Sequence, residues 1–267
     1  MKNYKIARKL IEQEKYEEAA GLLEAAGRDA PSSLAIHATH GMALVYAKRY
    51  EEALDVLEKK ALPLDVTYQP ALMNVGDAYF MLNNFEKAGL AFSAASKNDP
   101  LDPTAHYKLG KTLLLTQKTN DAHSEFAEAV RLFPDFPEAQ FELATLLADA
   151  QQYPQAIEHF QKSIALKPEN EMAHYNLGRS LLMTGKNAAA ADRLREATRL
   201  NPQHGAAWIN LGIALLSSGK PTEGKGALRR ATEIPDSAIE AHMNLAIAAL
   251  KEKDRDGAKQ HYEQVLR

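Results

Sequence analysis

Histidine gives this chain its widest range of chemistry, because imidazole is a common metal ligand. The chain has nine histidines in 267 residues. His37 and His40 lie in the stretch HATH, at a spacing that could place two imidazoles on one helix face to hold a metal. Four of the nine, however, recur at a single position of the 34-residue repeat described below, where a large packing residue is expected: His37, His106, His174 and His242. We therefore predict structural histidines and no metal site.

Two Gly-Lys pairs, Gly185–Lys186 and Gly219–Lys220, could be fragments of a phosphate-binding loop. Such a loop needs a glycine five residues earlier and a serine or threonine after the lysine, and neither stretch has them. The sequence also lacks the Gly-x-Ser-x-Gly pattern of serine hydrolases and the His-Glu-x-x-His pattern of zinc proteases. We predict that the chain is not an enzyme, has no catalytic residues and uses no cofactor.

Bulk composition excludes several classes of partner. The formal net charge of -3 gives no reason to expect nucleic acid or an anionic membrane surface. The absence of cysteine excludes disulfides and cysteine-based zinc sites. No apolar run is long enough to span a membrane, and the charged N-terminus lacks an apolar signal core. We expect a cytoplasmic protein if the chain is complete, and the location is unknown if the chain is a fragment of a longer protein.

One pattern returns every 34 residues. The stretch AHYNLGRSLLMTG begins at Ala173, AAWINLGIALLSSG at Ala206 and AHMNLAIAALKEK at Ala241. With Gly178 numbered as position 8, every repeat has a small residue at positions 8 and 20 and a large apolar residue at position 24. Proline occupies position 32 in five repeats: Pro31, Pro100, Pro134, Pro168 and Pro202.

This spacing predicts a pair of helices in each repeat. Positions 4, 7, 8 and 11 lie on one face of a first helix, and positions 20, 24, 27 and 28 lie on one face of a second. Glycine or polar residues at positions 15 and 16 separate the helices, and proline at position 32 ends the second one. Such a pair cannot bury its apolar face alone, so it must stack on its neighbours.

The pattern resembles the tetratricopeptide repeat over nearly the whole chain, and residues 105–136 are a close single copy. The resemblance implies an all-α fold, a right-handed superhelical solenoid of antiparallel helix pairs that binds other proteins. We predict one solenoid over residues 1–267. We expect a kink at 61–69, because the second repeat is one residue longer than the 34-residue period and Pro63 comes early in it. The eight repeats are 1–33, 34–68, 69–102, 103–136, 137–170, 171–204, 205–238 and 239–267, the last one incomplete.

Asparagine at position 6 of three consecutive repeats is the most specific functional signal. In tetratricopeptide proteins, positions 2, 5, 6, 9 and 13 of the first helices form the inner, concave wall; we call this surface the first-helix wall. An asparagine side chain offers one donor and one acceptor group and matches a peptide unit. The row of Asn176, Asn210 and Asn244 is similar to the asparagine ladder of O-linked N-acetylglucosamine transferases, although consensus residues without a binding role are the alternative.

Other residues of the first-helix wall complete the predicted peptide-binding surface. An apolar group surrounds the asparagines, and methionine suits surfaces that accept varied partners: Met172, Met183, Ile209, Ile213, Met243 and Ile247, with Arg179 among them. Further along, the wall is polar and aromatic, with Tyr107, Lys108, Lys111, Phe141 and Tyr175. The aromatic residues could stack on a partner or could pack between repeats.

The sequence thus predicts a non-catalytic scaffold that binds a protein or peptide segment in its groove. It leaves two alternatives open. The chain could be the substrate-recruiting module of a larger enzyme, such as a glycosyltransferase, or of an envelope-assembly protein. It could also form homo-oligomers through its uncapped C-terminal edge. No repeat has the Lys and Asn at positions 5 and 9 by which tetratricopeptide co-chaperones grip a terminal carboxylate, so we predict no such clamp.

Overall fold

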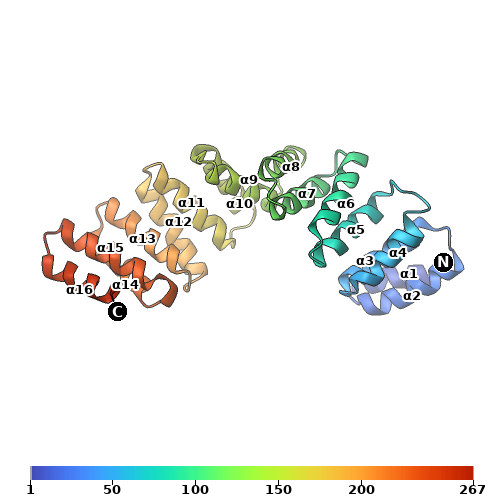
Figure 1. Ribbon diagram of the computed structural model, residues 1–267, viewed down its shortest axis with the longest axis horizontal. Coiled ribbons are helices and arrows are strands. Elements are labelled where there is room, and N and C mark those ends of the chain that lie inside the picture. The colour runs from blue at the N-terminus through green and yellow to red at the C-terminus, as the bar shows by residue number, and fades with distance from the viewer. Residues whose placement is uncertain (1, 267) are drawn as a thin grey trace. The chain divides into compact units, whose positions relative to one another are not determined.

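A computed structural model describes residues 2–266, and within this range the secondary structure is entirely helical. Figure 1 shows the helices following one another as antiparallel pairs. The α-helices are α1 (Lys2–Glu12), α2 (Tyr16–Asp29), α3 (Leu34–Tyr46), α4 (Tyr50–Val56), α5 (Gln69–Met81), α6 (Phe85–Asn98), α7 (Pro103–Leu115), α8 (Thr119–Leu132), α9 (Pro137–Asp149), α10 (Tyr153–Leu166), α11 (Glu171–Met183), α12 (Asn187–Leu200), α13 (Gly205–Ser217), α14 (Pro221–Thr232), α15 (Ala238–Lys251) and α16 (Arg255–Val265). The prediction of an all-α repeat of helix pairs is confirmed.

The chain divides into two compact halves, an N-terminal half (Met1–Pro134) and a C-terminal half (Asp135–Arg267). The boundary follows Pro134, which occupies position 32 of its repeat. Each half is described separately below. The single solenoid over 1–267 and its repeat boundaries stay predictions.

The turn inside every repeat has the same backbone geometry. Position 15 adopts a positive φ in all eight repeats, and only Gly185 and Gly219 are glycines there: Glu14, Lys48, Asn83, Gln117, Gln151, Gly185, Gly219 and Lys253. The backbone N–H of position 16 donates a hydrogen bond to the carbonyl oxygen of position 11, as from Lys186 to Leu181 at 2.9 Å. This six-residue closure satisfies a free carbonyl at the end of the first helix. The turn therefore sends the chain back antiparallel.

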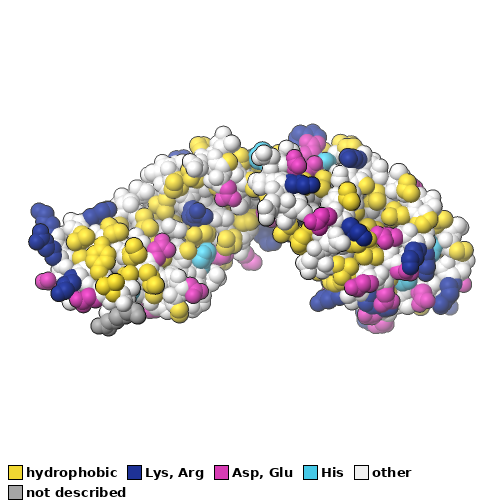
Figure 2. All heavy atoms as spheres, in the orientation of Figure 1, with side chains coloured by type: hydrophobic (Ala, Val, Ile, Leu, Met, Phe, Trp, Pro, Cys, Tyr) yellow, Lys and Arg dark blue, Asp and Glu magenta, His cyan; other side chains and the backbone are white. Residues whose placement is uncertain are grey.

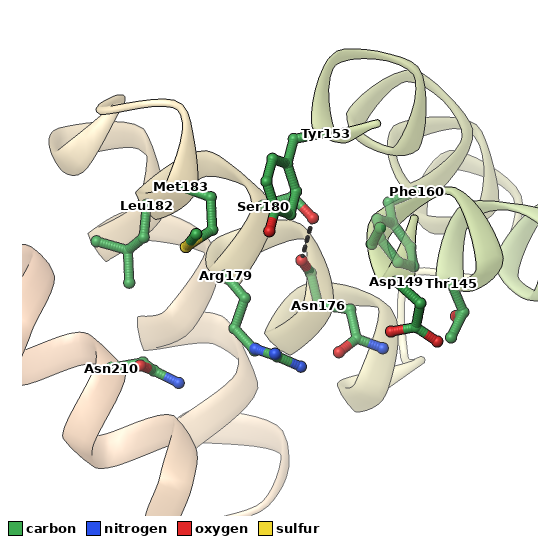
Figure 3. Close-up of a pocket in the computed structure, with 11 residues that line it drawn as sticks. Thr145, Asp149, Tyr153, Phe160, Asn176, Arg179, Ser180, Leu182, Met183 and Asn210 are labelled. Carbon is green, nitrogen blue, oxygen red and sulfur yellow. Dashed lines mark hydrogen bonds between the residues drawn. The ribbon is translucent and has the colours of Figure 1, made fainter. Parts of the chain in front are cut away.

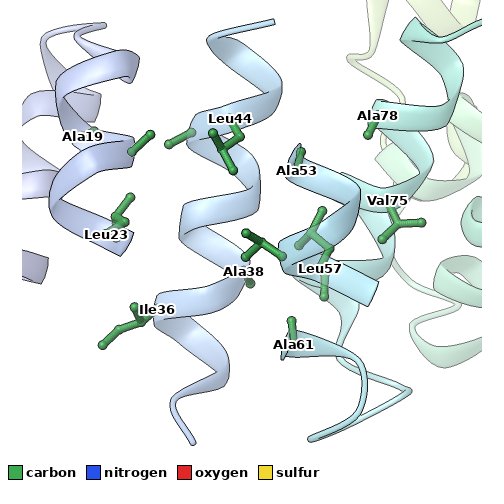
Figure 4. Packing of buried hydrophobic residues seen from close by; sticks show 14 of the residues in the cluster. Ala19, Leu23, Ile36, Ala38, Leu44, Ala53, Leu57, Ala61, Val75 and Ala78 are labelled. Carbon is green, nitrogen blue, oxygen red and sulfur yellow. The ribbon is translucent and has the colours of Figure 1, made fainter. Parts of the chain in front are cut away.

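Small residues at position 8 bring the two helices of a repeat close together. A Cβ atom added to Gly178 would lie 2.5 Å from Cγ of Leu194, and one added to Gly110 would lie 2.7 Å from Cε1 of Phe126. The position-24 side chain thus fills the space above position 8. The N-terminal half has the same packing, since a Cβ added to Gly41 would lie 2.4 Å from Cγ of Leu57. Figure 4 shows Leu57 in this core, beside Ala38 and Ala53.

The histidines at position 4 tie successive repeats together. Nε2 of His37 lies 2.8 Å from the carbonyl oxygen of Pro31, and Nε2 of His174 lies 3.0 Å from that of Pro168. Trp208 makes the same bond, donating from Nε1 to the Pro202 carbonyl at 2.9 Å. A carbonyl only accepts, so these histidines carry their proton on Nε2. A ring with an N–H at its edge makes this bond, which explains how histidine and tryptophan interchange at position 4, whereas Leu72 and Gln140 occupy the same position in two other repeats.

Two repeats depart from this regular pattern. In the second, α4 is short and continues into a π-helical turn, Leu57–Ala61, after which residues 62–68 lie outside helices. In the seventh, α14 contains Gly224 and Gly226 and is followed by a 3-10 turn, Pro235–Ser237. A kink at 61–69 stays a prediction.

Candidate functional site

A cavity of about 240 Å³ opens on the first-helix wall of the C-terminal half. It lies among α9, α10, α11 and α13, and Figure 3 shows Arg179, Asn176 and Asp149 projecting into it side by side. Four of the predicted residues line it: Asn176, Arg179, Met183 and Asn210. The structure therefore brings two of the three predicted asparagines together with a guanidinium and a carboxylate.

The three asparagines differ in their partners. The amide of Asn244 donates to the carbonyl of Glu240 in its own helix at 2.9 Å. The Asn210 amide lies 3.4 Å from the Tyr175 hydroxyl, which is a long hydrogen bond. The side chain of Asn176 makes no hydrogen bond with any residue between 2 and 266. Of the three, Asn176 has the donor and acceptor most available to a ligand.

The backbone under Asn176 is held firmly. The hydroxyl of Ser180 donates to the Asn176 carbonyl at 2.9 Å, the dashed line in Figure 3. Ser180 is itself buried, and Leu177 beside Asn176 is also buried. The side chain of Asn176 therefore projects from a fixed point on α11.

Tyr175, His204 and Arg179 form a group of contacting side chains toward α13. The Tyr175 ring lies 4.4 Å from the His204 ring, and the Arg179 guanidinium lies 5.7 Å from the Tyr175 ring centre. Nδ1 of His204 pairs with the Glu171 carboxylate. Burial raises the pKa of the Tyr175 hydroxyl, against an opposing effect of Arg179, so the phenol stays neutral and can hydrogen-bond. This group fixes Arg179 at the edge of the cavity.

Apolar side chains continue the surface away from the cavity. Met172, Met243 and Ile247 are exposed, Met183 is 64% exposed and Ile213 is half-buried. Figure 2 shows hydrophobic side chains gathered over α15 and its neighbours. Exposed apolar groups of this size on one surface are typical of contact sites.

Ile209 is a correction to the predicted surface. Its side chain is 1% exposed and packs against Leu228, Ala241 and Leu245 in the core. The expectation that it lines the groove is wrong, because position 5 of α13 is covered by α14 and α15.

The aromatic run at position 5 is packed against rings inside the protein. Tyr107 lies 5.9 Å from Phe126, and Phe141 lies 5.9 Å from Phe160, each within its own repeat. Tyr107, with Lys108 and Lys111, belongs to the N-terminal half, whereas Phe141 and Tyr175 belong to the C-terminal half. These contacts favour a packing role for the rings.

One lining residue was not predicted to reach the wall, Tyr153 from the start of α10. Thr145 and Asp149 of α9 also line the cavity, and they occupy positions 9 and 13, which the repeat pattern places on the first-helix wall. A signal for Tyr153 exists, because position 17 is also aromatic in three other repeats, at Tyr16, Tyr50 and Phe85. Nothing in the spacing indicates that position 17 reaches the wall, since it belongs to the second helix.

Two further findings bear on other classes of chemistry. Within the described range 2–266, there is no cluster of three His, Asp or Glu side chains that could hold a metal ion. No helix in that range is long and apolar enough to cross a membrane.

The arginines of the second helices pair with carboxylates at the surface. Arg195 contacts Asp192 at 3.1 Å and Glu223 at 3.2 Å, and Arg199 contacts Glu196 at 2.6 Å. These pairs are typical of a solvated face.

Comparison with protein families gives a direct match. Models described as "Tetratricopeptide repeat" match residues 4–66, 39–103, 74–122, 107–171, 175–239 and 240–267. The chain belongs to the tetratricopeptide repeat family. No curated protein sequence matches the chain.

Solved structures agree with this family. MamA is 25% identical, with a TM-score of 0.57, and the match covers 63% of this chain and 92% of MamA. YrrB is described as a tetratricopeptide protein with an unusual peptide-binding site. It is 21% identical, with a TM-score of 0.63, and the match covers 68% of this chain and 94% of YrrB. The C-terminal part of a tetratricopeptide repeat protein from Cytophaga hutchinsonii is 16% identical with a TM-score of 0.67, covering 86% of this chain and 94% of its own. Family and fold together support a protein-interaction scaffold.

Proposed function

We propose that this tetratricopeptide protein holds a peptide segment of a partner on the first-helix wall of its C-terminal half, without catalysis of its own. The observation that carries the proposal is the unpaired side chain of Asn176, which lines a cavity beside Asn210 and Arg179. The segment is extended, with apolar side chains.

The asparagines account for the extended backbone. A carboxamide can accept from one peptide N–H and donate to one C=O. Asn176 and Asn210 occupy the same position of successive repeats, so they offer two such contacts along one strand. Contacts of this kind read the backbone and not the side chains.

The neighbouring side chains account for the apolar preference. Met183 and Met172 are exposed beside the asparagines, with Ile247 further along on α15. The flexible thioether of methionine adapts to side chains of different shape. Arg179 and Asp149 add one charge of each sign at the cavity, so a strongly charged segment gains little there.

The test is an array of extended peptides of about twelve residues, probed with the full chain. We expect Asn176→Ala to weaken binding about tenfold, because a polar group of the bound backbone loses its partner. Asn244→Ala is the matched control with a smaller effect, since its amide is already bonded within α15. The triple variant Asn176→Ala/Asn210→Ala/Asn244→Ala should lose binding while its circular dichroism stays helical. Binding that survives in the folded triple variant would contradict the proposal.

A second candidate function is self-association through α15 and α16. Tyr262 is 40% exposed, although Phe160 and Leu194 at the same repeat position are fully buried. Ile239 on α15 and Leu266 after α16 are also exposed. Light scattering over a concentration series should show a rising mass that Tyr262→Lys suppresses. A constant monomer mass for the wild-type chain would exclude this function.

A further inference from the structure

A second groove lies on the first-helix wall of the N-terminal half. Two adjoining cavities of about 180 and 350 Å³ share Asp77, Phe80 and Lys108. We call this surface the lysine–aromatic groove, and its principal residues are Tyr46, Asp77, Phe80, Met81, Lys108 and Lys111. They come from the first helices of three successive repeats, α3, α5 and α7.

The groove has an excess of positive charge. Its one carboxylate, Asp77, is neutralised by Lys108, whose Nζ lies 2.7 and 2.6 Å from the two Asp77 oxygens. Lys111 and Lys48 also line the groove, and neither forms an ion pair with a residue in the described range. Two cations are therefore left for a ligand, and a carboxylate is the group that complements them.

Lys111 is held in position by aromatic rings. Its Nζ lies 5.9 Å from the Phe80 ring centre and 5.8 Å from the Tyr107 ring centre. Cation–π contacts orient an ammonium without neutralising its charge. The ammonium of Lys111 is thus positioned and still able to bind an anion.

Apolar surface lies directly beside the lysines. Tyr46 is 58% exposed and Met81 is 52% exposed, and both line the larger cavity with Phe80. The Tyr46 ring is supported from below by Tyr16, stacked at 4.9 Å. A rigid aromatic ring and a flexible methionine next to each other suit an inserted apolar side chain.

We propose that the lysine–aromatic groove binds an acidic segment of a partner protein that carries a bulky apolar side chain. A carboxylate of the segment pairs with Lys111, and a second one reaches Lys48. The apolar side chain lies on Phe80, Met81 and Tyr46. This site is separate from the one around Asn176, lies in the other half of the chain and selects a different kind of segment.

Protein fits this groove better than nucleic acid does. Nucleic-acid affinity rests on many lysine and arginine contacts to phosphates, whereas this groove has two unpaired lysines and contains Asp77. Two carboxylates on either side of an apolar side chain use every part of the groove.

The experiment measures anisotropy of fluorescein-labelled peptides with the full chain. One peptide set carries Glu residues on both sides of a central Phe, a second replaces Glu with Gln, and a third replaces Phe with Gly. We expect the acidic Phe set to bind at least about tenfold tighter than either control set. Absence of binding by the acidic Phe set, or equal binding of all three sets, would overturn the proposal.

Matched variants locate the site. Lys111→Ala should weaken binding of the acidic Phe set about tenfold. Lys97→Ala removes one exposed lysine of the same half, on α6 outside the groove, and should leave binding unchanged. Met81→Ala should weaken the Phe set and leave the Gly set unchanged. Equal losses for Lys111→Ala and Lys97→Ala would mean non-specific attraction and refute the site.

Two controls separate this proposal from other outcomes. Asn176→Ala should not change binding of the acidic set, and a loss there would assign these peptides to the other half and overturn the inference. Oligothymidine that binds as tightly as the acidic set and is lost in Lys111→Ala would identify a nucleic-acid site instead. Failure of the array test on Asn176 leaves this result unaffected, because the two tests use different peptides and the variants that locate each site lie in different halves of the chain.

Discussion

Three glycines of the C-terminal half should respond to the same change, Gly→Ala, in three different ways. Gly226 lies inside α14 with nothing within 4 Å of a new Cβ. Gly185 also has nothing within 4 Å, but its φ is +74°. At Gly212 a new Cβ would lie 2.6 Å from Cγ of Leu228 and 3.0 Å from the carbonyl oxygen of Gly224.

The structure gives the size and sign of each effect. Gly226→Ala should raise the free energy of unfolding by about 1 kcal/mol, because alanine loses less backbone freedom in a helix. Gly185→Ala should lower it by about 1 kcal/mol, because a Cβ is strained at positive φ. Gly212→Ala should lower it by about 1–3 kcal/mol, since Leu228 is fully buried and cannot swing away. Ala144 occupies the same repeat position without a clash, so helix spacing can adjust and the lower end is expected.

The assay is urea unfolding followed by the fluorescence of Trp208, the chain's one tryptophan, which lies on α13 in the same half. Circular dichroism measured in parallel reports helix content of the whole chain. The urea midpoint should be highest for Gly226→Ala, intermediate for the wild type and lower for both Gly185→Ala and Gly212→Ala.

Two results would refute the reasoning. If Gly185→Ala were as stabilising as Gly226→Ala, the turn at position 15 could not need a left-handed residue. If Gly212→Ala were neutral, the close approach of α13 to α14 would not be required for stability.

Two further predictions concern the N-terminal half and the ends of the repeats. Burial, together with the positive charge of Lys60, lowers the pKa of His40 from 6.5 to about 4. Folding therefore favours the neutral imidazole. The contribution of His40 to the free energy of unfolding is full above pH 6.5 and decreases as the pH falls toward 4. At about pH 5 the free energy of unfolding should be lower by about 2 kcal/mol, measured as the difference in urea stability between pH 7.5 and 5. The variant His40→Leu should lack this pH dependence. An equal pH dependence in that variant would contradict the assignment to His40. In hydrogen exchange followed by mass spectrometry, residues 62–68 and α16 should exchange faster than α8 and α10, because they are non-helical or largely exposed. Protection of residues 62–68 equal to that of α8 would contradict this expectation.

The sequence was sufficient for the local architecture because a helix pair is specified within one repeat. The 3.6-residue period places positions 4, 7, 8 and 11 on one face wherever the repeat occurs. Small residues recur at position 8 and large ones at position 24, and the structure places these positions together, as at Gly178 and Leu194. The positive φ at position 15 could be predicted at Gly185 but not at Gln151, because glutamine rarely adopts it.

The tertiary structure decided which wall residues are available to a partner. Ile209 and Met243 both occupy position 5, yet Ile209 is buried under α14 and α15 while Met243 is exposed. Asn176 and Asn244 both occupy position 6, yet one is unpaired and the other is bonded to Glu240. A repeat pattern assigns every copy the same face, whereas exposure and hydrogen bonding depend on the side chains that the adjoining repeat places opposite.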